Sequence, residues 1–242
     1  MAKNIKKILN VLIYLIFIPL TVFLGTYVFK DRQYVVISVI LAVLVILGFF
    51  MSFERKKTTI KEVSIVTVMV AFSVVGRLIF VAVPSFKPIS AIVIIAGIAF
   101  GYEAGFMVGA LSSLISNFYF GQGAWTPFQM VAFGIIGMLA GLLFRKGNVK
   151  TYKVLLFGSI AGIFYSMFMD IWTVISIDNA FNFSRYGAVL LTSLPIACIY
   201  VVSNVVFLLV LTKPMLKQAD RLKAKYRIFE VENEVDFPED FW

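Results

Sequence analysis

Long apolar stretches, each close to the length that crosses a lipid bilayer, are the feature that most constrains this sequence. A spanning helix needs about 20 mostly apolar residues, because the hydrocarbon core is ~30 Å thick and an α-helix rises ~1.5 Å per residue. Apolar residues make up 61% of the 242 residues and charged residues 14%, whereas soluble domains carry roughly 25% charged residues. The sequence therefore predicts an all-α integral membrane protein.

Eight segments qualify, or nearly qualify, as membrane spans. They cover residues 8–28, 34–53, 63–83, 88–101, 104–120, 127–144, 154–177 and 186–211. The fourth and fifth segments are short and are joined only by residues 101–105. A tight helical hairpin that stops short of one membrane surface fits this pattern as well as two full spans do.

The basic residues indicate the orientation of these spans. If the N-terminus is cytoplasmic, most of the 22 Lys and Arg fall in inner connections or at the two ends of the chain. The outer connections then hold only Lys30, Arg32, Lys87 and Arg185, while Arg77 lies within a span. The positive-inside rule therefore predicts eight spans with both the N- and C-termini in the cytoplasm.

Composition along the chain divides it into three parts. Residues 1–62 are predicted to form two N-terminal transmembrane helices and a basic cytoplasmic linker. Residues 63–212 form a six-helix core that contains nearly all the intramembrane glycine and polar residues, so we expect the function there. Residues 213–242 form a cytoplasmic tail, first basic and then acidic, which is expected to lie on anionic lipid headgroups or to dock a partner.

The residue inventory excludes several classes of protein. The chain has no His and a single Cys, Cys198, which excludes His-ligated zinc, Ser-His-Asp and Cys-His catalysis and any intrachain disulfide. It has no P-loop for ATP. We therefore predict no catalytic residues, no metal site, no cofactor and no nucleic-acid partner, and we expect any uphill transport to draw its energy from partner proteins.

Two charged residues lie deep within the predicted spans. Arg77 and Asp170 are 14 and 16 residues along two outward-running helices, or ~21 and ~24 Å, so both reach the outer half of the bilayer. A lone charge there is costly and marks functional sites. We therefore expect Arg77 and Asp170 to pair or to line one cavity, and a pair that only locks two helices together is the alternative.

Further polar and aromatic residues gather near the same outer surface. Asn117 ends the fifth span, and the outer connection of residues 121–129 opens the sixth. Gln122, Gln129 and the exposed N–H groups at this helix start are expected to hydrogen-bond a polar ligand. The aromatic members of this set also fit a belt at the membrane interface. With Arg77 and Asp170, the candidate substrate-binding residues are Lys87, Asn117, Tyr119, Gln122, Trp125, Gln129 and Trp172.

Rows of small residues mark close helix contacts in the membrane. One row places a small residue at every fourth position from Gly97 to Ser113, and Gly137 with Gly141 repeats the spacing, which predicts helix packing. A second row lies on the inner half of the third span. It is a candidate contact face for another membrane protein, with packing inside the chain as the alternative, and it comprises Ser64, Thr67 and Ala71.

Residues 65–143 resemble the substrate-binding S components of energy-coupling factor (ECF) transporters. The resemblance is carried by Thr67–Ala71 with Arg77, Phe86–Ile89, the hairpin Phe100–Ser113, and Gly121–Gln129 followed by Gly134 and Gly137. It implies a bacterial plasma-membrane protein with an S-component-like bundle of six helices, preceded here by two extra spans. Such a protein binds a vitamin from outside and works with a membrane coupling protein and two cytoplasmic ATPases, whose ATP hydrolysis makes the S component topple and release its substrate.

The resemblance also suggests roles for particular residues. Family members use an Ala-x-x-x-Ala row to contact the coupling protein, and here the row reads Thr67-x-x-x-Ala71. The stretch Gly121–Gln129 is similar to that of members associated with cobalamin uptake, so cobalamin is the predicted transported ligand. Another vitamin or a modified-base precursor is the alternative. Two other classes of function stay open: a membrane scaffold without a ligand, and an intramembrane enzyme that uses Asp170 and Arg77 on a lipid-like substrate.

Overall fold

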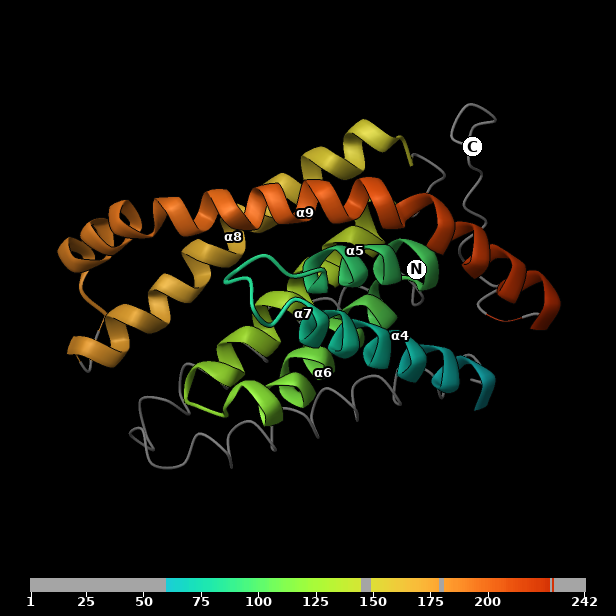
Figure 1. Cartoon of the computed structure of the whole chain (residues 1–242), viewed down its shortest axis with the longest axis horizontal. Helices are drawn as coiled ribbons and strands as arrows, with labels where there is room; N and C mark the ends of the chain where they lie inside the picture. The colour runs from blue at the N-terminus through green and yellow to red at the C-terminus, as the bar shows by residue number, and fades with distance from the viewer. Residues whose placement is uncertain (1–59, 145–148, 179–180, 227, 229–242) are drawn as a thin grey trace, which may run out of the picture.

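Six helices make up the part of the chain that the computed structural model describes, namely residues 60–144, 149–178, 181–226 and 228. Each of the six core spans predicted above corresponds to one of these helices, which confirms the all-α membrane bundle. The two predicted N-terminal helices and the acidic end of the tail lie outside the described residues. Figure 1 shows the helices in chain order: α4 (Ile60–Ile79), α5 (Ile89–Phe100), α6 (Tyr102–Phe120), α7 (Trp125–Leu143), α8 (Thr151–Asp178) and α9 (Phe183–Tyr226).

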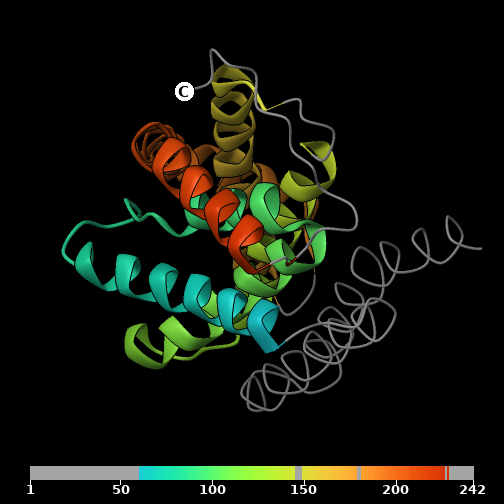
Figure 2. The same ribbon diagram turned by 90° about the vertical axis from the view of Figure 1, so that its right-hand side faces the viewer.

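The shortest helix, α5, forms the centre of the bundle. All twelve of its residues are buried, and it contacts every other helix of the described chain, which Figure 2 shows arranged around it. Twelve residues span only about 18 Å, so α5 is too short to cross the bilayer. A single residue, Gly101, joins it to α6 with a φ of 94°, which residues with a side chain rarely adopt. The tight hairpin is therefore the arrangement that forms.

Glycines let α5, α6 and α7 approach until their backbones touch. A Cβ atom added to Gly105 would lie 2.7 Å from Gly97 Cα and 2.7 Å from the carbonyl carbon of Gly137. A Cβ on Gly109 would lie 2.8 Å from the backbone nitrogen of Gly134. The packing predicted for the small-residue row is confirmed, since no side chain larger than hydrogen fits between these helices without moving them apart.

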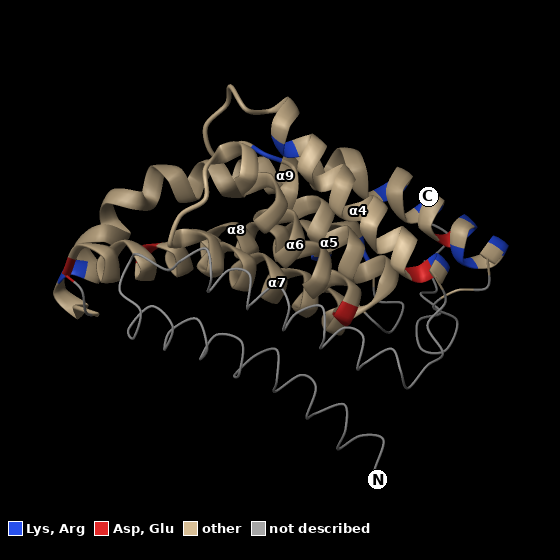
Figure 3. Ribbon diagram, turned by 90° about the horizontal axis from the view of Figure 1, so that it is seen from below, with Lys and Arg blue, Asp and Glu red and all other residues tan. Residues whose placement is uncertain are grey.

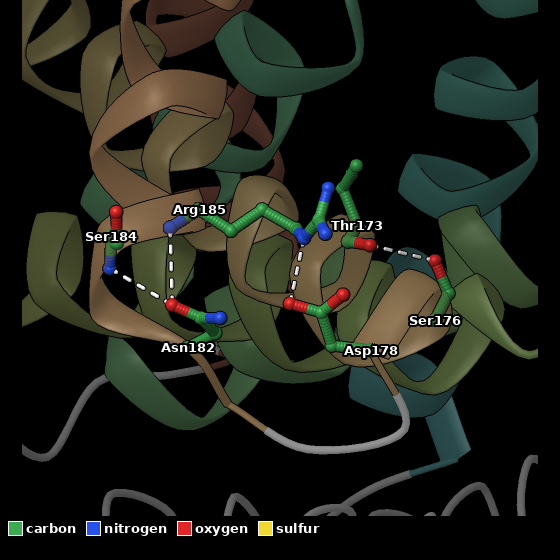
Figure 4. Close-up of polar contacts among 6 residues, drawn as sticks. All are labelled: Thr173, Ser176, Asp178, Asn182, Ser184 and Arg185. Carbon is green, nitrogen blue, oxygen red and sulfur yellow. Dashed lines mark hydrogen bonds and ion pairs between the residues drawn. The ribbon is translucent and has the colours of Figure 1, made fainter.

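The turn between α8 and α9 is fixed by polar contacts at the predicted outer surface (Figure 4). Asn182 Oδ1 accepts hydrogen bonds from the backbone N–H groups of Ser184, at 3.0 Å, and Arg185, at 3.2 Å. It thereby satisfies N–H groups that have no partner inside the first turn of α9. The Arg185 side chain also pairs with Asp178 at the end of α8, with an Nε to Oδ2 distance of 2.6 Å.

Helix α9 continues well past the predicted end of the last span at residue 211. It runs for 44 residues through Pro195 and Pro214, and Leu216 and Ala219 on its extension are buried. Lys61 at the start of α4 lies over the ring of Tyr226, 5.3 Å from its centroid. Figure 3 shows charged residues concentrated at this end of the bundle, where α4 starts and α9 ends, as expected of the cytoplasmic side.

Candidate binding site

The outer ends of α4 and α6 are joined by an arginine that is almost completely buried. Arg77 lies in the last turn of α4 and is 8% exposed. Its Nη1 donates hydrogen bonds to the hydroxyl of Ser116 and to Oδ1 of Asn117, the latter at 3.1 Å. Both partners are buried and uncharged, so they orient the guanidinium group without neutralising its charge.

Asn117 connects Arg77 to side chains of the neighbouring helices. Its Nδ2 donates to Thr126 Oγ1 at 2.9 Å and to Gln129 Oε1 at 2.8 Å, both on α7. Gln129 Nε2 in turn donates to the hydroxyl of Tyr165 on α8 at 3.1 Å. The outer ends of α4, α6 and α7 and a residue of α8 are thus held together by one chain of hydrogen bonds, which in a membrane replaces the contacts that water would supply.

A second cation joins Arg77 over one aromatic ring. Arg77 Cζ lies 4.8 Å and Lys87 Nζ 5.1 Å from the ring centroid of Phe120 at the end of α6. The backbone of Lys87 is fixed to α9, because its N–H donates to Ser203 Oγ at 3.0 Å and its carbonyl accepts from the same hydroxyl at 3.1 Å. Burial lowers the pKa of the Lys87 ammonium group, and the nearby charge of Arg77 lowers it further.

Aromatic rings from three helices lie beside the hydrogen-bond network. The ring of Tyr165 stacks on Phe133 of α7, with the centroids 4.4 Å apart, and meets Tyr200 of α9 edge to face at 4.9 Å. Tyr165 is buried, with 4% of its surface exposed. This side of the site combines flat apolar surfaces with hydroxyl groups, a lining that suits ligands with ring systems.

Asp170 does not pair with Arg77, so the direct ion pair in our hypothesis is wrong. The Asp170 carboxylate instead accepts a hydrogen bond from Ser193 of α9 at 2.5 Å. Residue counting placed the two charges at the same depth, but it gave no information on which helices are neighbours: α4 packs mainly on α5 and α6, while α8 packs on α9 and α7. Tyr200 lies within electrostatic reach of both charged groups.

Four of the other candidate residues take no part in the hydrogen bonds described for the Arg77 network, although the ring of Tyr119 meets that of Phe120 edge to face at 5.3 Å. Tyr119 and Trp125 are 67% and 40% exposed, positions that fit interfacial aromatic residues. Gln122 donates to the backbone carbonyl of Leu114 at 2.9 Å. Trp172 packs against an aromatic ring of α7. Of the candidates that the sequence suggested, the structure brings together Arg77, Lys87, Asn117 and Gln129.

Several residues of the cluster escaped the sequence analysis. Ser116, Thr126 and Tyr165 complete its hydrogen bonds, and Phe120 is the ring that both cations share. Ser, Thr, Tyr and Phe are common in spanning helices, so their type gives no signal. Position offers one clue, since Ser116 and Phe120 lie on either side of Asn117 at the outer end of the same helix.

The small-residue row of α4 is on the surface of the bundle. Ser64, Thr67 and Ala71 are all exposed, and only 28% of the most apolar part of this helix is buried. The hydroxyls of Ser64 and Thr67 each donate to the carbonyl four residues earlier in the helix, at 2.9 Å. The row therefore presents small, internally hydrogen-bonded side chains to whatever lies beside it in the membrane.

Comparison with known proteins identifies the family. The sequence model described as "ECF-type riboflavin transporter, S component" matches residues 57–217, which include all the described helices except the last turns of α9. The chain belongs to this family. It is a multi-pass membrane protein of the bacterial plasma membrane, and its family consists of substrate-binding subunits of transporters.

Curated relatives share part of the chain. A UPF0397 protein of Aliivibrio fischeri strain MJ11 is 27% identical over 128 residues, which cover 46% of this chain and 69% of the relative. A UPF0397 protein of Aliivibrio salmonicida strain LFI1238 has the same identity over the same shares of each chain. No solved structure matches the chain.

Proposed function

We propose that this protein is the substrate-binding S component of an ECF importer, which captures a vitamin or related micronutrient at the outer face of the plasma membrane. The observation that carries the proposal is the Arg77 network. Arg77 is buried and has no acidic partner among the described residues. An arginine in the outer half of a spanning helix is costly, and membrane proteins keep such residues where they bind something. Here it lies among polar side chains from neighbouring helices, beside the aromatic surfaces of Tyr165 and Tyr200.

The energy for import comes from other proteins in this proposal. A membrane coupling protein contacts the α4 face formed by Ser64, Thr67 and Ala71, and two cytoplasmic ATPases drive the cycle. The support for this face is its exposure together with its small side chains, which allow another helix to approach closely in lipid.

Two vitamins are the first substrates to test. The sequence of Gly121–Gln129 favours cobalamin, whereas the description of the matching family names riboflavin. The full chain is produced in a bacterium that lacks its own uptake of each vitamin, with and without the ECF coupling protein and ATPases, and uptake of the radiolabelled vitamin is measured.

Uptake that requires both this chain and the energising proteins supports the proposal, and the purified chain should then retain the same vitamin through chromatography. Co-purification with the coupling protein without uptake or retention of any vitamin would contradict it and favour a scaffold.

A further inference from the structure

Two cations meet at one ring of the binding site, and neither has an acidic partner among the residues that the structure describes. Arg77 and Lys87 both lie over Phe120, at 4.8 and 5.1 Å. The ion pairs recorded in the described part of the chain join Arg185 to Asp178 and Lys223 to Asp220, and none involves Arg77 or Lys87. A site with two positive charges and no counter-charge is electrostatically incomplete.

Arg77 has hydrogen-bond donors left over for a ligand. Both of its recorded hydrogen bonds leave from Nη1, and a guanidinium group has five N–H donors in a planar fork. Within the described chain, the donors on Nε and Nη2 therefore have no recorded protein acceptor. An arginine with one nitrogen held by neutral partners and the other two without an acceptor in the described chain can receive a pair of oxygen atoms.

The charge balance argues against a purely structural role for these two cations. Ser116 and Asn117 give Arg77 hydrogen bonds but no negative charge. Asp170 of α8 already accepts a hydrogen bond from Ser193, and it takes part in neither ion pair of the described chain. Two like charges at low dielectric repel, and each stays ionised most easily when an anion is added between them. Burial is the main cause of the lowered pKa of Lys87, and the charge of Arg77 lowers it further in the direction that such repulsion requires.

We propose that the site binds ligands through an ionised carboxylate or phosphate group, which Arg77 holds by two N–H groups and Lys87 neutralises as a second cation. This inference rests on the proposed function and narrows its substrate class to anionic micronutrients. Riboflavin carries no ionised group at neutral pH, so it is expected to bind weakly compared with its phosphate ester. Cobalamin carries a phosphodiester and stays within the class.

The test uses inorganic phosphate and acetate as probes of the full chain purified in a neutral detergent. The midpoint of thermal unfolding is measured at constant ionic strength while each anion replaces chloride. At about ten times its dissociation constant, a bound anion is expected to raise the midpoint by about 3–6 °C. The larger shift identifies the preferred group: phosphate for a phosphoryl ligand and acetate for a carboxylate.

Matched variants decide whether the shift comes from this site. Arg77→Gln and Lys87→Gln should each abolish most of it, and Arg77→Lys should retain less than half, because an ammonium group cannot offer the planar pair of donors. Arg185→Gln should keep the full shift, since Arg185 pairs with Asp178 in the exposed turn between α8 and α9 (Figure 4). Lys87 lies in a connection and is partly exposed, so its variant tests the inference even if Arg77→Gln does not fold.

A shift that is absent, or equal in the wild type and Lys87→Gln, would overturn the inference. It would also fail if the purified protein bound riboflavin as tightly as riboflavin phosphate, although the proposed import function would then still stand. Conversely, an Arg77-dependent anion shift in a protein that imports no vitamin would support the anion site and refute the proposed function.

Discussion

A methyl group added to Gly105 should separate the three central helices. The new Cβ would lie 2.7 Å from Gly97 Cα and from the carbonyl carbon of Gly137, whereas carbon atoms in contact prefer 3.5–4.0 Å. Both obstacles are backbone atoms, so rotation of a side chain cannot relieve the overlap and whole helices must shift. Overpacking of this kind costs about 1–3 kcal/mol, and two backbone clashes place Gly105→Ala near the upper value.

The same substitution also improves helix propensity, and a second glycine, Gly187, allows this effect to be measured alone. Alanine is more favourable than glycine in a helix by about 1 kcal/mol, so the net loss expected for Gly105→Ala is about 2 kcal/mol, or a fall of about 4–8 °C in the unfolding midpoint. Gly187 lies in the exposed first turns of α9, and nothing is within 4 Å of a Cβ built there. Gly187→Ala should therefore raise the midpoint by about 1–4 °C.

Thermal unfolding of the full chain in one detergent, followed by intrinsic fluorescence, measures both variants. If Gly105→Ala is as stable as the wild type, the close backbone contact between α5, α6 and α7 does not exist in the protein. If Gly187→Ala is destabilised as strongly as Gly105→Ala, the loss does not come from packing.

Three further predictions test the site and the α4 face. Asn117→Ala removes one hydrogen bond to Arg77 and two to α7. An average hydrogen bond in a membrane contributes about 0.6 kcal/mol and one to a charged group contributes more, so the variant should lose about 2–3 kcal/mol of stability. An unchanged unfolding midpoint would contradict this. Exchanging the charges in an Arg77→Asp, Asp170→Arg double variant should not restore ligand binding lost in Arg77→Asp, because the two residues do not pair; recovery in a binding assay would show that they do. Thr67→Leu should reduce ATP-driven uptake at least tenfold while leaving ligand binding by the isolated chain unchanged. Val68→Leu, at an exposed neighbour outside the small row, should leave uptake within about twofold.

Hydropathy was enough to predict which segments are helical, but not where the long helices end. Most of the core helices were found because crossing the lipid requires about 20 mostly apolar residues, whose backbone groups a helix satisfies internally. The 12-residue helix α5 was found as a shorter apolar stretch. The last helix was predicted to end at residue 211, where the lysines begin, yet α9 continues to Tyr226. Beyond the lipid its course depends on tertiary packing of residues such as Leu216, which hydropathy over a window does not register.

The sequence predicted how far along each helix the site residues lie, but not which helix faces meet. Counting residues placed Arg77 and Asp170 in the second half of their helices, which is where they lie. The predicted pairing failed because α4 and α8 are not close neighbours. Asn117 and Gln129 were found because amides in spans are conspicuous. Phe120 and Tyr165 were missed, since their roles depend on which side of the helix faces the arginine and no single sequence contains that information.

The short length of α5 explains why Lys87 reaches Arg77. One residue, Gly101, separates α5 from α6, which is 19 residues long against 12, so the outer end of α6 extends about 10 Å farther along the hairpin. The connection that holds Lys87 therefore enters α5 below the outer end of α6, and Ser203 fixes it there through both backbone groups of Lys87. Non-helical backbone at that depth is tolerated only where protein or a ligand site satisfies it. Ser203→Ala should therefore release the connection and weaken phosphate or acetate binding at least threefold, because Ser203 holds the backbone of Lys87. Thr192→Ala, an exposed substitution on the same helix, should leave binding unchanged.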